Sequence, residues 1–197
     1  MLESIQASNK EICSERNKLY QMVKSYKNNG KLSSSQQQTL TFYCDYYKIK
    51  QSNSIAEKLS HLDMKIGVTP TSFILAQAIL ESGWGTSRFA RDYNNYFGLH
   101  CFSKGCGVKA NGAEVYLETF TNAEESILGY YYRLNTGSKF RDFRIIRQKV
   151  QENKLPSSTL LYTLEDYSEL QGNEYKDRLE SVIRQNKLNQ YDKLAQC

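Results

Sequence analysis

The chain has 197 residues, 40% of them hydrophobic and 24% charged, and its formal net charge is +5. These values are typical of a globular domain with one well-buried core. The basic residues form no run of five or six, which argues against a nucleic-acid-binding tract, and no apolar stretch approaches the roughly 18 residues of a membrane span.

The first 64 residues are predicted to form a layer of helices. Apolar residues recur on one face over residues 2–27, and the Asn-Asn-Gly sequence at 28–30 supplies a left-handed C-cap. Three serines at 33–35 offer N-cap hydroxyls for a second helix that runs to Tyr47, and a third helix covers residues 54–64. We expect residues 1–64 to be a helical extension packed on a core formed by residues 65–197.

A buried helix is predicted to follow and to end at an acidic residue. Thr69 is expected to cap it, with Pro70 at its first position, where a missing N–H costs nothing. Residues 73–80 are almost wholly apolar, and the next residue is Glu81. The only tryptophan, Trp84, lies in the glycine-broken turn that comes after it.

A carboxylate in such surroundings is partly desolvated, which raises its pKa toward that of a usable general acid. Glu81 is therefore a candidate catalytic acid. The alternative is a structural ion pair between Glu81 and Arg88 or Arg91.

Between residues 98 and 120 the pattern changes to glycine-punctuated, strand-like sequence, which predicts a small β-lobe. Helical periodicity returns over residues 123–134, with Thr121 or Asn122 as cap, and again near 139–152 and 175–186. The predicted fold class is α+β and mostly helical, with one cleft between the helical lobe and the β-lobe.

Five cysteines suggest disulfide chemistry. Cys101 and Cys106 share a short loop that can bring them within bonding reach, so we predict a disulfide between them and an extracytoplasmic location. A second bridge between Cys13 and Cys44 would leave Cys197 over. The alternative is a metal site that adds His100 to Cys101 and Cys106, but it has no evident fourth ligand, so no metal is predicted.

The β-lobe offers two carboxylates that can complement Glu81 in glycoside hydrolysis, a reaction that pairs an acid with a group stabilising or attacking the sugar cation. Glu114 precedes the predicted strand and Glu118 lies inside it. Strand alternation places both on one face, so the pattern does not choose between them.

With these residues in view, the chain resembles the glucosaminidases of the glycoside hydrolase family 73 type, in their Bax-like branch from bacterial envelopes. The resemblance covers residues 65–192 and rests on matching segments that occur in order: 76–87 (AQAILESGWGTS), 93–98 (YNNYFG), the Cys101 to Gly107 loop, 134–136 (LNT), 167–169 (YSE), Tyr175 and Asn186.

The resemblance implies a lysozyme-like fold and assigns roles within it. It makes Glu81 the general acid, Glu114 the β-lobe acid and Tyr167 a residue near the scissile sugar. Relatives often carry Tyr where this chain has Phe140, which puts only a polar role for that residue in doubt.

Five further residues are candidates for substrate binding. The aromatic side chains of Trp84, Tyr93 and Tyr96 can stack on sugar rings, although each can also belong to the core. Asn94 and Asn95 can hold N-acetyl or hydroxyl groups, but asparagine pairs are also ordinary turn residues.

The resemblance therefore predicts a peptidoglycan hydrolase that cleaves the β-1,4 bond after N-acetylglucosamine. Peptidoglycan strands are the expected partner, and no cofactor, nucleic acid or membrane segment is expected. The rivals are a muramidase or lytic transglycosylase on the same fold, and a non-catalytic wall-binding module. The location is expected to be the periplasm or cell envelope, although the chain shows no signal-peptide pattern. Retaining, inverting and substrate-assisted routes all remain open.

Overall fold

In the computed structural model, helices form most of the molecule and two short strands form its only sheet among the described residues. The structure describes residues 1–197 except 52, 103–104, 112–113, 169–172 and 195–196. The predicted α+β, mostly helical class is confirmed. Among the described residues, no helix combines the length and apolar character needed to cross a bilayer.

Three helices form the N-terminal part, and the end of the first and the start of the second follow the predicted capping signals. They are α1 (Leu2–Asn29), α2 (Ser34–Tyr46) and α3 (Ile55–Lys65). Gly30 ends α1 in the left-handed conformation, at φ 66°. Ser33 caps α2 and Ser54 caps α3, each in a reciprocal capping box with the residue three positions on.

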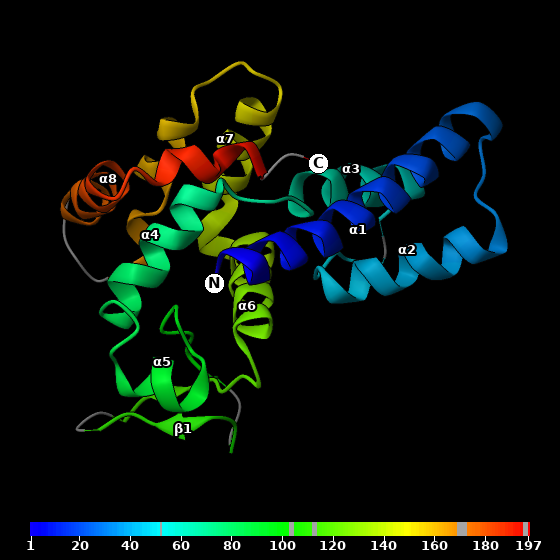
Figure 1. The fold of residues 1–197 in the computed structure, drawn as a ribbon. Coiled ribbons are helices and arrows are strands. Elements are labelled where there is room, and N and C mark those ends of the chain that lie inside the picture. Colours follow the sequence, from blue (N-terminus) through cyan, green and yellow to red (C-terminus); the bar gives the residue numbers. More distant parts are fainter. Residues whose placement is uncertain (52, 103–104, 112–113, 169–172, 195–196) are drawn as a thin grey trace.

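The second part of the chain builds the helical body around α4 (Thr71–Ser82). It also contains α6 (Ala123–Thr136), α7 (Arg141–Gln151) and α8 (Glu174–Gln185), with 3-10 turns at Ser138–Phe140, Ser157–Thr163, Glu165–Tyr167 and Leu188–Leu194. In Figure 1, α4 runs down toward a separate end of the molecule that is formed by α5 and the sheet.

That end contains α5 (Arg88–Tyr93) and the antiparallel pair β1 (Val108–Lys109) and β2 (Tyr116–Leu117). Val108 pairs with Leu117 and Lys109 with Tyr116. The strand predicted over 113–120 is thus only two residues long, and Glu118 lies just beyond it. Asn122, one of the two predicted caps, accepts from the backbone N–H of Glu125 at the start of α6.

A single apolar core joins the two parts of the chain. It contains residues of α1, such as Ile5 and Leu19, together with residues of α4, α6 and α8, such as Ile74, Tyr130 and Leu179. Helix α1 packs mainly on α6 and α3. The predicted division after residue 64 falls in the last turn of α3, and it stays a prediction.

The start of α4 corrects one local prediction. The helix begins at Thr71, and Pro70 rather than Thr69 is its N-cap residue. The capping acceptor is the carboxylate of Asp192, which accepts from the Ser72 backbone N–H at 2.8 Å and from the Ser72 hydroxyl at 2.9 Å. Because Asp192 lies 120 residues further along the chain, no local pattern could reveal this cap.

Candidate active site

Glu81 lies in the last turn of α4, directly before a tightly fixed turn. Gly83, Trp84 and Gly85 have φ values of 56°, 60° and 74°, so three residues in a row adopt the left-handed region that only glycine enters readily. The Ser82 hydroxyl accepts from the Gly85 backbone N–H at 2.7 Å, which closes the turn. A hydrogen-bonded turn thus fixes the chain directly after Glu81. Trp84, within this turn, is 65% exposed.

The Glu81 carboxylate is half-buried among uncharged groups. Burial raises its pKa, and a hydrogen bond from Tyr175 opposes that rise. The Tyr175 hydroxyl donates to Glu81 Oε1 at 2.7 Å. Among the described residues Glu81 has no ion-pair partner, and the Arg88 guanidinium donates instead to the Lys109 carbonyl. The structure thus contains no ion pair of the kind that the structural alternative requires.

Tyr167 lies next to Tyr175, the hydrogen-bond partner of Glu81. Its ring stacks on that of Tyr175, with centroids 6.3 Å apart and planes 9° from parallel. Its hydroxyl donates to the Phe97 carbonyl at 2.9 Å. Burial raises the pKa of Tyr167 well above its ordinary value, and the nearby Glu81 charge raises it further. The hydroxyl is therefore a neutral donor beside the candidate acid.

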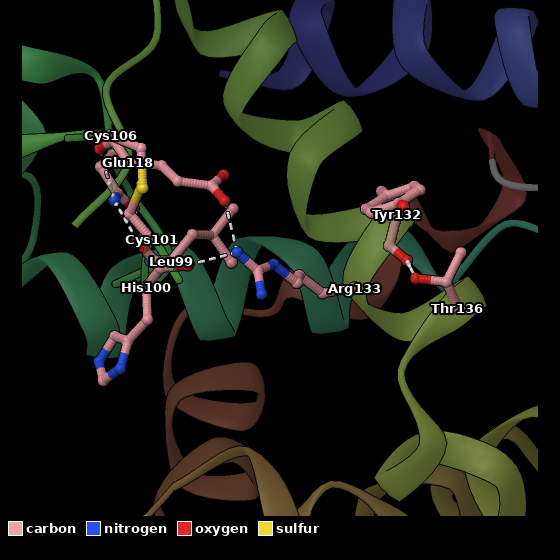
Figure 2. Close-up of polar contacts among 9 residues, drawn as sticks. Leu99, His100, Cys101, Cys106, Glu118, Tyr132, Arg133 and Thr136 are labelled. Atoms are coloured by element: carbon pink, nitrogen blue, oxygen red, sulfur yellow. Dashed lines mark hydrogen bonds and ion pairs between the residues drawn. A yellow bond between two sulfur atoms is a disulfide. The ribbon is translucent and has the colours of Figure 1, made fainter. Parts of the chain in front are cut away.

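The two β-lobe carboxylates have different surroundings. Glu118 is half-buried and forms an ion pair with Arg133 of α6, which also donates to the His100 carbonyl (Figure 2). The Glu114 side chain is 88% exposed and pairs with Lys109 of β1. Glu118 thus links the β-lobe to α6, whereas Glu114 lies exposed at the surface of the hairpin.

The two asparagines of the 93–98 segment hold the β-lobe in place. The Asn95 side chain is 1% exposed; its amide N–H donates to the carbonyls of Leu99 and Glu118, and its oxygen accepts from the Leu99 N–H. Asn94 ends α5 at φ 53°, and its side chain donates to the Phe120 carbonyl at 3.1 Å. For Asn95 this geometry favours the structural alternative, because no polar atom of its side chain is left for a sugar.

The sequence of the chain is similar to those of known proteins. A sequence model described as mannosyl-glycoprotein endo-beta-N-acetylglucosaminidase matches residues 56–188. The chain belongs to the glucosaminidase family. It is 30% identical over 185 residues to protein bax of Escherichia coli (strain K12), a match that covers 92% of this chain. The chain spans 65% of the length of that relative.

A solved structure is also similar. The catalytic domain of the autolysin Auto from Listeria monocytogenes is 21% identical, with a TM-score of 0.48; the match covers 82% of this chain and 99% of that one.

The glucosaminidase match includes every site residue predicted above. Tyr93 ends α5, where its ring packs on Phe89 and beneath the Arg88 guanidinium. Tyr96 is half-buried, and its backbone N–H donates to the Ser126 hydroxyl. Of the three candidate aromatic residues, Trp84 is thus the one that exposes most of its ring.

The cysteines of the chain confirm the predicted bridge and show a second one whose pairing the sequence left open. Cys101 and Cys106 form a disulfide, with Cα atoms 6.0 Å apart, so these two thiols are not available to the alternative metal site. The second bridge joins Cys13 to Cys197 rather than to Cys44, which is a buried free thiol. The possible pairing of Cys13 with Cys44 rested on helix adjacency, whereas the fold carries Cys197 back to α1.

Two contacts of the site were not predicted from the sequence, that of Tyr175 with Glu81 and that of Arg133 with Glu118. Tyr175 entered only as part of the family pattern, and nothing local indicated its contact with a carboxylate 94 residues earlier. Arg133 was not singled out at all. A basic residue in the last turn of a helix is common, so its contact with Glu118 had no distinctive signal.

Proposed function

We propose that the chain is a peptidoglycan hydrolase that cleaves the β-1,4 glycosidic bond after N-acetylglucosamine, with Glu81 as general acid. The observation that carries the proposal is the half-buried Glu81 carboxylate, whose pKa is raised by burial and which has no cationic partner among the described residues. Membership of the glucosaminidase family supports the reaction class.

In this proposal Glu81 donates its proton to the departing glycosidic oxygen. An acid with a raised pKa keeps its proton near neutral pH and gives it up as negative charge develops on the leaving group. Tyr167 supplies a neutral hydroxyl beside the reacting sugar. Trp84, Tyr93 and Tyr96 provide apolar surface for sugar rings, and Asn94 contributes polar contacts.

The β-lobe supplies the opposing carboxylate, for which we propose Glu114, with Glu118 as the alternative. Glu114 is exposed on the hairpin, and in this proposal its carboxylate faces the sugar opposite Glu81. A separation of about 5–5.5 Å between the two carboxyl groups serves a nucleophile, and about 6.5–9.5 Å leaves room for an attacking water. A third route uses the N-acetyl oxygen of the substrate, and then only Glu81 is required.

The two disulfides support an extracytoplasmic location, in the periplasm or cell envelope. Disulfides persist in oxidising compartments and are rare in the cytosol. One bridge closes the β-lobe loop and the other ties Cys197 to α1. Peptidoglycan, the proposed substrate, is found in the same compartment.

Mass analysis of digested peptidoglycan tests the proposed reaction. A glucosaminidase releases fragments with a new reducing N-acetylglucosamine end. Fragments that end in reducing N-acetylmuramic acid would indicate a muramidase, and 1,6-anhydro products a lytic transglycosylase. Wild-type protein that binds peptidoglycan but releases no fragment would indicate a wall-binding module.

A further inference from the structure

A buried chain of hydrogen bonds reaches Glu81 from inside the helical body. Tyr130 of α6 donates to Gln77 Oε1, and Gln77 Nε2 donates to the Tyr175 hydroxyl oxygen at 2.9 Å. Tyr175 in turn donates to Glu81 Oε1 at 2.7 Å. Tyr130 and Gln77 are fully buried and Tyr175 is 2% exposed, so water does not compete for the two inner bonds of the chain.

The chemistry of the groups gives this chain one direction. An ionised carboxylate only accepts hydrogen bonds, so Tyr175 has to point its proton at Glu81. The Tyr175 oxygen then needs a donor, which requires the N–H end of the Gln77 amide. The carbonyl end of Gln77 therefore faces Tyr130, whose hydroxyl proton satisfies it. If the amide turned over, Gln77 would compete with Glu81 for the Tyr175 proton.

The same chain of hydrogen bonds gives the two carboxyl oxygens of Glu81 different surroundings. Oε1 is occupied by the Tyr175 hydroxyl. Oε2 faces Gly98, where a Cβ atom would lie 3.8 Å away. Gly98 has a φ of 61°, a conformation that L side chains rarely adopt, so this approach stays free of a side chain. Oε2 is thus the oxygen left to carry a transferable proton.

We propose that Gln77 and Tyr130 are positioning residues, which act through Tyr175 to hold Glu81 with its transferable proton on Oε2. The inference rests on the proposed role of Glu81 as general acid. The described titratable groups that interact with the Glu81 carboxyl are three tyrosines: Tyr175 from α8, Tyr167 from the 3-10 turn before it, and Tyr130 from α6. None of them is cationic, so hydrogen-bond direction is the means of control.

The direction of the expected change in the Glu81 pKa follows from the hydrogen bond that the Tyr175 hydroxyl donates. It stabilises the ionised form of Glu81 and so lowers the pKa of Glu81 against the rise caused by burial. Removing or misdirecting that donor raises the pKa of Glu81. A general acid works in its protonated form, so the alkaline limb of the activity profile moves to higher pH.

An NMR titration of the Glu81 side-chain carboxyl tests the proposal without relying on activity. Tyr175→Phe is expected to raise the Glu81 pKa most, and Tyr130→Phe to raise it by a smaller amount. The double variant is expected to match Tyr175→Phe alone, because Tyr130 acts only through Tyr175. Tyr131→Phe is the matched control, since this buried hydroxyl on the same helix donates to Asn9 instead, and it is expected to leave the Glu81 pKa unchanged.

Gln77→Met gives a second route if Tyr130→Phe does not fold. It removes the link, so it is expected to raise the Glu81 pKa and to make a further Tyr130→Phe change silent. An unchanged Glu81 pKa in both Tyr130→Phe and Gln77→Met, or shifts that add in the double variants, would overturn the proposal.

An activity assay on the same variants separates this inference from the proposed function. The expected result is a lower kcat, an alkaline limb at higher pH and an unchanged KM. If the wild type hydrolyses no glycan while the NMR shifts follow the expected pattern, the proposed function fails and the positioning chain stands. If the wild type is active and the shifts are absent, the positioning chain fails alone.

Discussion

Glu81 on α4 and the hairpin glutamates Glu114 and Glu118 differ in what surrounds their carboxylates. Glu81 is half-buried among tyrosines, and burial raises its pKa. Each hairpin glutamate instead forms an ion pair with a basic residue, Glu114 with Lys109 and Glu118 with Arg133. The difference teaches that α4 offers a carboxyl group with a raised pKa and no cationic partner among the described residues, whereas the hairpin offers carboxylates that are paired with cations. Glycoside hydrolases commonly use an acid together with a second carboxylate.

Removing the acidic proton of Glu81 has the largest expected effect on activity. Glu81→Gln keeps the size of the side chain but has no acidic proton, so we expect peptidoglycan hydrolysis to fall about 10²- to 10⁴-fold. Zymograms and rates of fragment release measure this. Arg88→Gln is a control, because the Arg88 guanidinium does not pair with Glu81. Unchanged activity in Glu81→Gln would remove Glu81 from the acid role.

The two disulfides, one in the β-lobe and one in the helical part, are expected to stabilise the fold to different extents. The Cys13–Cys197 bridge spans 184 positions and the Cys101–Cys106 bridge spans 5. Chain-entropy arguments therefore predict that replacing both cysteines of a pair with serine lowers the free energy of unfolding by about 5 kcal/mol for the long bridge and about 2 kcal/mol for the short one.

Denaturant unfolding at neutral pH measures both losses. The short bridge belongs to the β-lobe, so we also expect the serine pair at 101 and 106 to reduce activity more than the serine pair at 13 and 197 when each is assayed well below its unfolding midpoint. The opposite ranking of activities would contradict a catalytic contribution from the β-lobe.

Substitutions distinguish the roles of the two hairpin carboxylates. We expect Glu114→Gln to reduce hydrolysis by about tenfold or more, the low end of the contribution of a positioned catalytic group, and to leave thermal stability unchanged because the side chain is exposed. Glu118→Gln is expected to lower the melting temperature, because Arg133 loses its partner. Full activity in Glu114→Gln together with a folded, inactive Glu118→Gln would transfer the role to Glu118.

The raised pKa of Glu81 has a smaller effect, on the pH dependence of stability. The folded state holds this proton more tightly than the unfolded state, so stability falls as pH rises from the unfolded pKa toward the folded one. The wild type is therefore expected to lose stability relative to Glu81→Gln between acidic and neutral pH. Chemical denaturation of both proteins across that window measures it, and a difference independent of pH would contradict the raised pKa.

The sequence predicted what depends on neighbours along the chain. The C-cap at Gly30, a serine N-cap within residues 33–35 and a cap at Thr121 or Asn122 each involve residues within four positions, and the structure has Gly30, Ser33 and Asn122 in these roles. The Cys101–Cys106 bridge closes a short loop and was found for the same reason.

The missed features are contacts between distant segments. Asp192 caps α4 from 120 positions away, and Cys197 bonds to Cys13 across 184. For the site, local pattern identified Glu81 by its apolar helix and its glycine turn, but Tyr175 reaches it from α8. A carboxylate's own segment shows that it is buried, whereas the groups that tune it come from the tertiary fold.

The most direct test of Glu81 as general acid compares the activity that Glu81→Gln loses on two different substrates. A chitooligosaccharide has a poor leaving group that needs a proton, whereas a dinitrophenyl glycoside has a leaving group that departs without one. We predict that Glu81→Gln loses far more activity on the first substrate than on the second. Equal losses on both would contradict the account.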